Sequence, residues 1–454
     1  TGRPMSEVHR GAGSAPCPWK LLELGIDTPE TRIKGQFLQE SFYSEKLQAG
    51  TATVRFTLPN GATWERFIDR EIEPLVAADD NIRFFDHRRE WARTDFENDG
   101  LPRPEWENLL REAKKLADEA GHLRYALPKE FGGQDGTNLG MAIIREHFAR
   151  KGLGLHNDLQ NEHSIVGNFP QVIMMDRFGT DAQRKEWTEA LITGERSMAF
   201  GLTEPNHGSD ATWLETRAER DGDEWIINGT KVWTTAAHEA DYMIGLFRTS
   251  PATKENRRHG LTQFLVDMKK PGIQTRPILW PNGDHDFNEV VFEDVDLPAN
   301  HLLGEEDNAW MQATAELAYE RSGPERFLET IAVLIELVNL VGPTPDSRAA
   351  EGLGRLVAQL FTLRRMSISV AGMLAAGKEP VLEASIVKDL GTVWMQKLPD
   401  ICRDLGALID RDLAARQRFE AALTSNMLIA PKLTIQGGTT EILRGIIARG
   451  LGLR

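Results

Sequence analysis

The sequence predicts an α+β protein in which an N-terminal helical domain, a middle antiparallel β domain and a C-terminal helical bundle follow one another. Apolar residues recur at helical spacing before about residue 193 and again after about residue 305. Between these blocks the pattern changes to short runs rich in β-branched and aromatic residues. Because strands and helices are segregated along the chain, the pattern fits neither a doubly wound sheet nor a TIM barrel.

Size and charge narrow the classes of function. A chain of 454 residues can bury a large core in two or three layers or domains. Its 53 Lys and Arg residues against 68 Asp and Glu residues give a net charge of −15. This balance argues against nucleic acid or an anionic membrane as the main partner.

Cysteine usage and hydropathy predict a soluble protein of a reducing, cytoplasmic or other intracellular compartment. Cys17 and Cys402 cannot form a disulfide framework, and neither lies in a zinc-type spacing. No run approaches the ~18 apolar residues that a membrane helix needs.

The N-terminal part divides into two segments. Residues 1–63 are mixed in character and are expected to form an extension of uncertain structure. Residues 64–193 are expected to form the first helical domain, because the stretches WERFIDREIEPLV, WENLLREAKKLADEAG and AQRKEWTEALI carry apolar residues at helical spacing.

Residues 194–304 are expected to form the β domain, from the runs SMAFGLT, EWIINGTKVWTT, YMIGLF, LTQFLVDM and EVVFEDVDL. The pair Asn228-Gly229 between β-type residues predicts a hairpin with a type I′ turn. Residues 305–454 return to helical periodicity in MQATAELAYER, FLETIAVLIELVNL, LGRLVAQLFTLRRM and TEILRGIIARGLG.

Two stretches of the β domain carry groups suited to a ligand. FGLTEPNHGSD, residues 200–210, ends a strand in a turn that offers hydroxyls and backbone groups. In KVWTT, Trp233 and Thr235 stand two residues apart and share one face of a strand. An aromatic ring beside a hydroxyl suits a planar heteroaromatic ligand, although strand aromatics more often belong to the core.

In these motifs the sequence resembles the acyl-CoA dehydrogenase family. The resemblance rests on FGLTEPNHGSD, INGTKVWTT, FNEVVFEDVDLP, LAYER and IQGGTTEILRGIIAR, and covers roughly residue 64 to the end. The family's order of helical, β and helical blocks agrees with the order seen here.

The resemblance implies a cofactor site for FAD. Phe200, Leu202 and Thr203 would contact the pyrimidine side of the flavin, and Ser209 would reach the cofactor phosphate or the CoA. Trp233 would cover one side of the isoalloxazine and Thr235 would hydrogen-bond near N5. In the C-terminal motif the corresponding contacts fall on Thr439 and Glu441.

The reaction so implied is the α,β-dehydrogenation of an acyl-CoA thioester, with electrons passed to an electron-transferring flavoprotein. A homodimer or homotetramer is expected, because family members complete each flavin site from a neighbouring subunit. Here the regions that reach the neighbour depart from the family's pattern, in LVGPTPDSRAAEGLGRL and DLGALI. These departures would permit a non-catalytic accessory subunit of a heteromeric dehydrogenase as one alternative. An acyl-CoA oxidase is the other alternative, because it differs only in whether oxygen reaches the reduced flavin.

The catalytic base is expected to be Glu320. Many family members carry the base just before a Gly-Thr pair, where this chain has Gly437. Others carry it before an arginine on the first long helix after the β domain, which matches Glu320 and Arg321. Helical periodicity places Glu320 on the apolar stripe, where burial would raise its pKa. Arg321 is expected to anchor the following turn beside the substrate.

The other charged positions have plainer interpretations. Glu325 and Arg326 are expected to be structural, with Glu325 as the second candidate for the base. The pair Arg364-Arg365 is expected on a solvated helix face. His156 and His163 lack a third ligand in the sequence, so we expect no metal site.

Overall fold

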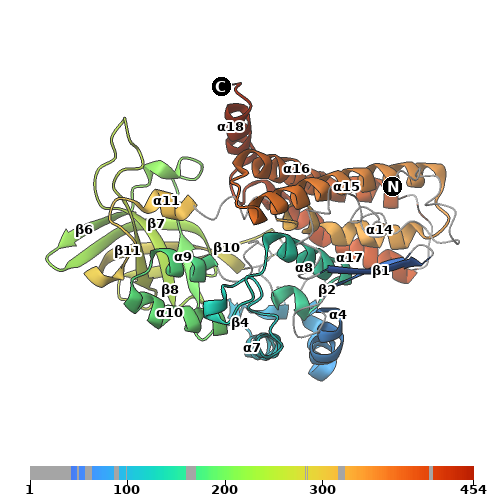
Figure 1. The fold of residues 1–454 in the computed structure, drawn as a ribbon, viewed down its shortest axis with the longest axis horizontal. Helices are drawn as coiled ribbons and strands as arrows, with labels where there is room; N and C mark the ends of the chain where they lie inside the picture. The colour runs from blue at the N-terminus through green and yellow to red at the C-terminus, as the bar shows by residue number, and fades with distance from the viewer. Residues whose placement is uncertain are drawn as a thin grey trace. The chain divides into compact units, whose positions relative to one another are not determined.

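The computed structural model describes residues 42–48, 51–56, 64–85, 92–98, 100–159, 170–281, 283, 285–314, 323–407, 409 and 413–453. The chain divides into two compact units (Figure 1). The β unit comprises residues 89–115 and 169–317, and the helical unit comprises residues 1–88, 116–168 and 318–454. The division into domains at residues 63, 193 and 304 stays a prediction, because the two units group residues by contact and not by chain order.

The β unit is built on one twisted sheet in the strand order β10-β11-β7-β6-β8-β9-β12, with β5 paired to β8. Its pairs are antiparallel except for β5 with β8 and β6 with β8. The strands are β5 (Met198–Gly201), β6 (Arg217–Asp221), β7 (Glu224–Thr235), β8 (Tyr242–Arg248), β9 (Leu261–Asp267), β10 (Ile273–Leu279), β11 (His285–Pro298) and β12 (Leu302–Leu303). A further short pair joins β3 (Thr94–Asp95) to β4 (Leu101–Pro102).

Helices α9 (Pro170–Phe178) and α10 (Asp181–Thr193) pack on this sheet. Met175 of α9 and Trp187 of α10 share an apolar cluster with Ile244 of β8. Thr180 begins α10 with a capping box to Gln183, as an N-terminal Thr followed by Gln predicts. Among the described residues, the other α-helical segments of the β unit are α11 (Ala309–Thr314) and the first part of α7 (Pro104–Glu119).

The helical unit is a bundle whose long helices follow one another in the chain (Figure 1). They are α14 (Ile331–Val341), α15 (Ser347–Ala375), α16 (Val381–Gly406), α17 (Leu413–Ile429) and α18 (Thr440–Gly450), preceded by α4 (Trp64–Phe67), α5 (Glu73–Ala77), α8 (Asn138–Lys151) and α13 (Glu325–Leu328). Two strands, β1 (Phe42–Gln48) and β2 (Thr51–Phe56), pair within the stretch expected to be an extension.

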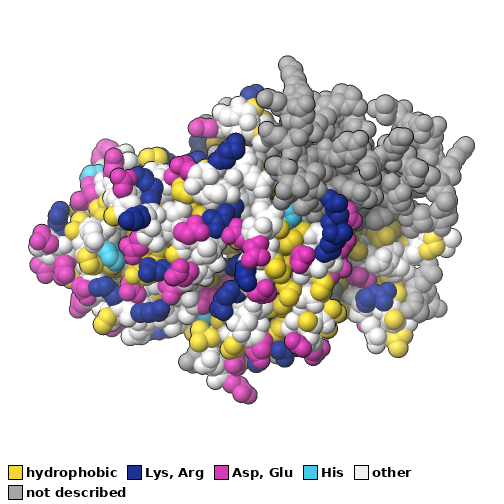
Figure 2. Space-filling view, turned by 60° about the horizontal axis from the view of Figure 1, so that its bottom comes forward, with side chains coloured by type: hydrophobic (Ala, Val, Ile, Leu, Met, Phe, Trp, Pro, Cys, Tyr) yellow, Lys and Arg dark blue, Asp and Glu magenta, His cyan; other side chains and the backbone are white. Residues whose placement is uncertain are grey.

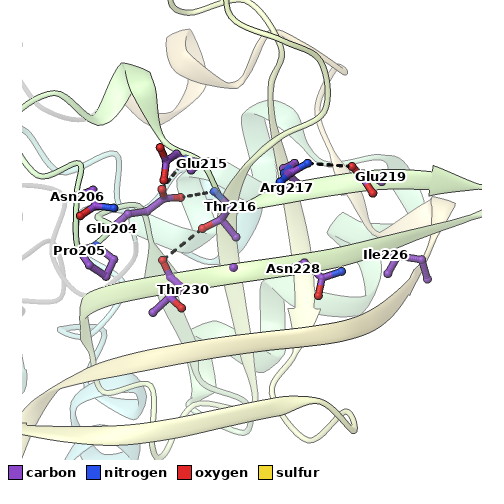
Figure 3. A pocket seen from close by; sticks show the side chains of 11 residues that line it. Glu204, Pro205, Asn206, Glu215, Thr216, Arg217, Glu219, Ile226, Asn228 and Thr230 are labelled. Atoms are coloured by element: carbon purple, nitrogen blue, oxygen red, sulfur yellow. Dashed lines mark hydrogen bonds and ion pairs between the residues drawn. The ribbon is translucent and has the colours of Figure 1, made fainter.

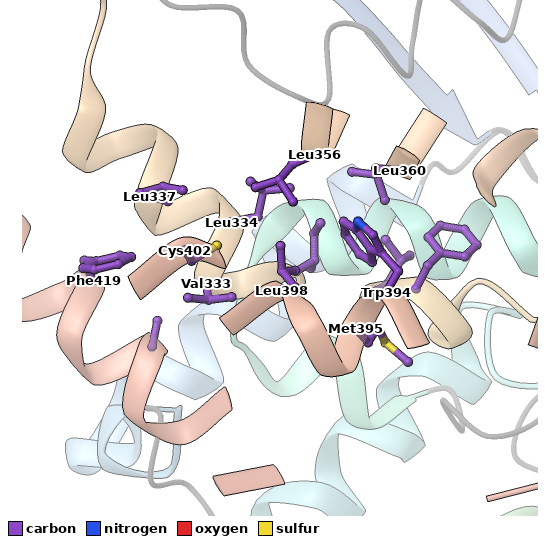
Figure 4. Close-up of a cluster of buried hydrophobic side chains, with 14 of the residues drawn as sticks. Val333, Leu334, Leu337, Leu356, Leu360, Trp394, Met395, Leu398, Cys402 and Phe419 are labelled. Carbon is purple, nitrogen blue, oxygen red and sulfur yellow. The ribbon is translucent and has the colours of Figure 1, made fainter. Parts of the chain in front are cut away.

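The core of the bundle is a cluster of aliphatic and aromatic side chains (Figure 4). Leu334 of α14, Leu360 of α15 and Leu398 of α16 are completely buried in it. Cys402 is a free, buried cysteine of the same cluster, and burial raises the pKa of its thiol. Cys17 lies outside the described residues. The predicted α+β class, with helices before and after a middle sheet, is confirmed.

The hairpin expected at Asn228-Gly229 is wrong. Both residues lie inside β7, where Asn228 pairs with Arg217, and the turn between β6 and β7 falls at residues 221–224. Gly229 is required for a different reason, since a Cβ atom there would lie 2.8 Å from Cα of Thr216. The sequence pattern therefore marked a close approach of two strands and not a turn.

The solvated face expected at Arg364 is also wrong. Arg364 of α15 is completely buried, and its Nε donates to both carboxylate oxygens of Glu146, at 2.8 and 2.9 Å. His156 is buried too, with Nε2 3.3 Å from the carbonyl oxygen of Phe148, while His163 lies outside the described residues.

Candidate functional site

The two sequence stretches expected to meet a cofactor lie side by side in the β unit. The backbone N–H of Val232 donates a hydrogen bond to the carbonyl of Thr203 at 2.8 Å. β5 ends just before this loop and pairs in parallel with β8, which sets Phe200 opposite Ile244. The structure therefore joins the loop after β5 to β7 immediately before Trp233.

Trp233 is both exposed and strained. The residue is 55% exposed and its φ is +60°, in the left-handed region. The register with β11 passes from Lys231 opposite Val290 to Thr234 opposite Asn288, so a β-bulge lies at this point. A bulky residue in this conformation costs on the order of 1–3 kcal/mol, and such strain is found most often at functional sites.

The groups around Trp233 suit a flat ligand. Thr234 is buried while Thr235 is exposed beside Trp233, as alternation along a strand predicts. Within the part of the chain that the structure describes, the hydroxyls of Thr203, Ser209 and Thr235 have no protein partner. The exposed indole offers a flat stacking surface, and the hydroxyls of Thr203, Thr235 and, further along the loop, Ser209 can donate hydrogen bonds, so the chemistry of these residues fits the expected flavin.

A buried ion pair that the sequence did not predict fixes the loop after β5. Lys231 of β7 is completely buried and its Nζ lies 2.8 Å from Oε1 of Glu204 and 3.3 Å from the carbonyl of Leu202. The Glu204 carboxylate also accepts hydrogen bonds from the backbone N–H groups of Glu215 and Thr216. A lysine at an inward-facing strand position needs a buried anion, which was the available sequence signal.

At neutral pH the Glu204 carboxyl is ionised and Lys231 is mostly, but not completely, protonated. Burial alone would raise the pKa of the Glu204 carboxyl, but the Lys231 ammonium and the backbone donors hold that pKa below its ordinary value. Burial lowers the pKa of Lys231 to about 8, and the Glu204 carboxylate opposes this shift. The pair therefore ties Leu202 and Thr203 to β7 by charge-assisted hydrogen bonds.

A polar hollow of about 590 Å³ lies beside Glu204 (Figure 3). It is lined by Glu204, Pro205, Asn206, Glu215, Thr216, Arg217, Glu219, Ile226, Asn228, Gly229 and Thr230. None of the residues expected to contact FAD lines it. Glu204, Pro205 and Asn206 of the loop after β5 line one side of this hollow, whereas Thr203 and Ser209 of the same loop do not.

Ser209 lies in an exposed loop that precedes the short helix η5 (Ala211–Trp213). Next to it, the Asp210 carboxylate lies 3.9 Å from the guanidinium of Arg257, which in turn lies over the ring of Trp213 at 5.2 Å. The hydroxyl of Ser209 is thus accessible to an anionic ligand.

In the helical unit, the expected base Glu320 and its neighbour Arg321 lie outside the described residues. Glu325 is described and buried, and its carboxylate lies 2.9 Å from Nη1 of Arg145 on α8. Arg326 is also buried and donates to Oε1 of Gln436 at 3.3 Å. Glu325 and Arg326 therefore join α13 to its neighbours.

The C-terminal motif forms a tight turn before α18. Gly437 and Gly438 have φ values of +65° and +103°, which favour glycine over any other residue. Thr439 caps α18, because its side chain accepts a hydrogen bond from the backbone N–H of Ile442. The carboxylate of Glu441 accepts hydrogen bonds from the Glu441 backbone N–H and from the Thr439 side chain, and these hold the pKa of Glu441 below its ordinary value. Buried Lys388 donates to the carbonyl of Gly438 at 2.6 Å and fixes the turn.

Within the described ranges, no group of three or more His, Cys, Asp or Glu side chains is arranged to hold a metal ion. No helix among the residues that the structure describes has the length and apolar character needed to cross a membrane. On the face shown in Figure 2, acidic and basic side chains are interspersed and do not form one basic patch.

Two protein-family models together match most of the first two thirds of the chain. Residues 62–195 match the model of the acyl-CoA dehydrogenase N-terminal domain, and residues 199–295 match the model of the acyl-CoA dehydrogenase middle domain.

Similar proteins agree with these matches. Acyl-CoA dehydrogenase IpdE1 of Mycobacterium tuberculosis is 32% identical over 340 residues, which cover 72% of this chain and 83% of that protein. Acyl-CoA dehydrogenase FadE29 of the same organism is 29% identical over 348 residues, covering 72% and 84%. Among solved structures, butyryl-CoA dehydrogenase from Megasphaera elsdenii has a TM-score of 0.67 at 23% identity and covers 86% of this chain and 96% of its own.

Proposed function

The chain belongs to the acyl-CoA dehydrogenase family, whose members depend on FAD, and from this premise we propose that it oxidises an acyl-CoA thioester to the trans-2-enoyl-CoA and passes the electrons to an electron-transferring flavoprotein. One observation carries the proposal. The hydrogen bond from Val232 to Thr203 joins the two cofactor motifs next to the exposed Trp233.

The residues of the β unit would hold the flavin. Trp233 would cover one side of the ring system, and the free hydroxyl of Thr235 would donate near N5. The backbone of Phe200 and Leu202 and the hydroxyl of Thr203 would contact the pyrimidine side. When bound, FAD supplies the acceptor for the β hydrogen, which leaves the substrate as hydride.

The phosphate and C-terminal contacts are proposed in the same way. Ser209 would bind a phosphate of FAD or CoA, since its hydroxyl is exposed. Thr439 and Glu441, at the start of α18, would approach FAD. Arg321 would anchor the turn beside the substrate.

Glu320 would remove the α proton. The conformation of Gly437 supports this assignment, because a φ of +65° disfavours a glutamate at the position where many relatives carry their base. A carboxylate partly desolvated by substrate has a raised pKa and becomes a better match for the α proton.

The proposal is tested by the colour and the substrate range of the purified protein. We expect a yellow protein whose absorption spectrum is that of bound FAD and which reduces an artificial electron acceptor with at least one acyl-CoA. The panel of thioesters should include butyryl-CoA and a steroid-derived acyl-CoA, because a butyryl-CoA dehydrogenase and the Tcur3481-Tcur3483 steroid ACAD share the fold. A colourless protein that takes up no added FAD would contradict the proposal.

Assembly and the final electron acceptor complete the proposal. We expect a homodimer or homotetramer in sedimentation, and an active monomer would contradict this. One structural neighbour is the ChsE4-ChsE5 complex of Mycobacterium tuberculosis, so a second chain should be sought if the protein alone binds no FAD. Slow reoxidation by oxygen is expected for a dehydrogenase, whereas rapid reoxidation would indicate an oxidase.

A further inference from the structure

Three polar side chains pack together at the end of β7, next to the bulge at Trp233. Asn288 is completely buried on β11 and lies opposite Thr234. Its Nδ2 lies 3.2 Å from the carbonyl oxygen of Thr234 and 3.0 Å from Nδ1 of His238. Its Oδ1 lies 2.8 Å from Nε2 of His285. We call Asn288, His238 and His285 the Asn288 network.

Hydrogen positions in the network follow from the chemistry of the groups. The two hydrogens of the Asn288 amide go to the Thr234 carbonyl and to Nδ1 of His238, and its oxygen accepts from Nε2 of His285. His238 is therefore neutral, with its hydrogen on Nε2. Burial lowers its pKa to about 4, in agreement with this assignment. The rings of His238 and His285 stack with centroids 3.8 Å apart, and rotation of the Asn288 amide would break its hydrogen bonds to Thr234, His238 and His285.

This network lies between two strained residues. Trp233 has a φ of +60° and Ala236 a φ of +54°. Residues keep such strained backbone conformations only where contacts with the surrounding structure hold them in place. The Ala236 N–H donates to the carbonyl of Asp286 at 2.8 Å, and the Asn288 side chain holds the Thr234 carbonyl between the two strained positions.

We propose that Asn288, with His238 and His285, is a positioning residue for the flavin site, holding the backbone of Thr234 so that Trp233 and Thr235 present their side chains in the bound geometry. Asn288 is buried and acts through β7 without contacting the cofactor itself. The inference rests on the proposed function, because it requires that Trp233 and Thr235 bind FAD.

The chain offers a control at the other bulge between the same two strands, where the bridging asparagine is exposed instead of buried. There Asn228 of β7 exchanges hydrogen bonds of 3.0 and 2.9 Å with Asp294, whose φ is +49°. Asn228 thus also bridges β7 to a left-handed residue at a shift in register, away from Trp233. Asn288→Ala and Asn228→Ala each remove one bridging amide, but only the first releases the end of β7.

The experiment titrates FAD into the apoprotein of the wild type and of each variant, and records thermal stability and the spectrum of the bound flavin. We expect Asn288→Ala to weaken FAD binding by at least about 10-fold and to change the visible spectrum, because the network loses several hydrogen bonds. Asn228→Ala should change FAD affinity by less than about 2-fold. FAD affinity in Asn288→Ala equal to that of Asn228→Ala would overturn the inference.

A second variant covers the case in which Asn288→Ala does not fold. His238→Phe keeps an aromatic ring against His285 but cannot accept from Asn288, so we expect about a 3-fold loss of FAD affinity. Unchanged affinity and spectrum in His238→Phe would then overturn the inference. If the wild type itself takes up no FAD, the proposed function fails, which is a different result from wild-type binding that the variants leave unchanged.

Discussion

The β unit and the helical unit both bury charged side chains, but these charges stabilise different features. In the β unit, the Glu204–Lys231 pair ties the loop after β5 to β7, next to the candidate flavin contacts. In the helical unit, Glu146–Arg364 joins α8 to α15 and Arg145–Glu325 joins α8 to α13. Buried charges in the β unit therefore fix the geometry of the loop that carries the proposed flavin contacts, whereas those in the helical unit fix helix packing.

The contrast separates residues that look alike in sequence. Lys231 and Arg364 are both cations with no exposed surface and a carboxylate partner. Loss of either cation should lower the free energy of unfolding, but only the loss of Lys231 should also lower the affinity for FAD. The following variants test where this distinction holds.

The largest effect is expected for Glu320→Gln, which keeps the shape of the side chain but cannot accept the α proton. Turnover should fall by about 10²- to 10⁴-fold with FAD still bound, as for other general bases. Steady-state kinetics on the best thioester, normalised to bound flavin, provide the measurement.

Glu325→Gln is the control for that variant, since it alters the buried pair with Arg145. It should lower the melting temperature and leave turnover per flavin within about 3-fold of wild type. Near-normal turnover in Glu320→Gln would show that Glu320 is structural. Moving the base, with Glu320→Gly and Gly437→Glu together, should restore only part of the activity, because a left-handed glutamate costs on the order of 1–2 kcal/mol.

Lys231→Met and Arg364→Met compare the two units directly. Each leaves a largely buried carboxylate without its cation, so each should lower the free energy of unfolding by about 3–5 kcal/mol. Denaturant melts measure this loss. FAD affinity should fall only in Lys231→Met, and an equal fall in both variants would contradict the division between the units.

Acid should destabilise the protein through buried histidines of both units. Burial lowers the pKa of His122 and His156 in the helical unit, and of His238 in the β unit, to about 4. Between the ordinary value of about 6.5 and about 4, the unfolded chain binds more protons, so stability is lost as the pH falls through this window. For a completely buried residue such as His122, the loss approaches about 3 kcal/mol.

His122→Phe tests the pH effect in the helical unit. The phenyl ring can keep the stack on Trp64, which His122 makes at 4.3 Å, and cannot be protonated. Melting temperatures between pH 7 and pH 4.5 should therefore fall less steeply than in the wild type. If the melting temperature of His122→Phe falls with pH as steeply as that of the wild type, His122 is not a source of the acid sensitivity.

The smallest effect is expected at Trp233. Trp233→Ala should weaken FAD binding by about 10-fold, since an aromatic contact contributes about 0.5–1.5 kcal/mol beyond its buried area. Trp233→Gly should lose the same affinity but be more stable than Trp233→Ala by about 1 kcal/mol, because glycine accepts a φ of +60°. Equal stability of the two variants would contradict the strain at this bulge.

Much of the β unit could be predicted from sequence because its signals are local. The runs that became β7, β8, β9 and β11 carry β-branched and aromatic residues at consecutive positions, and Trp233 and Thr235 are on one exposed side of the same strand. The family motifs lie in the loop and strand ends themselves, so recognising them also located the candidate site.

The errors arose where a residue's environment comes from distant parts of the chain. The solvent-exposed position expected for Arg364 is wrong because its partner Glu146 lies 218 residues away in the chain and cannot be recognised from the neighbouring sequence. Glu204 and Lys231 were overlooked because their pairing depends on how the loop after β5 returns to β7. The turn expected at Gly229 is wrong because the glycine is required by the approach of Thr216 and not by its neighbours in the chain.

The burial of Lys231 also protects this lysine from acylation by a thioester. An acyl-CoA thioester is an acylating agent, and an amine with a pKa of about 8 is partly in its neutral, nucleophilic form near neutral pH. Lys231 would therefore be prone to acylation by the substrate if its Nζ could be reached. Its complete burial against Glu204 and Leu202 denies the thioester an approach, so the same packing that fixes the loop keeps this lysine chemically inert while the β unit stays folded.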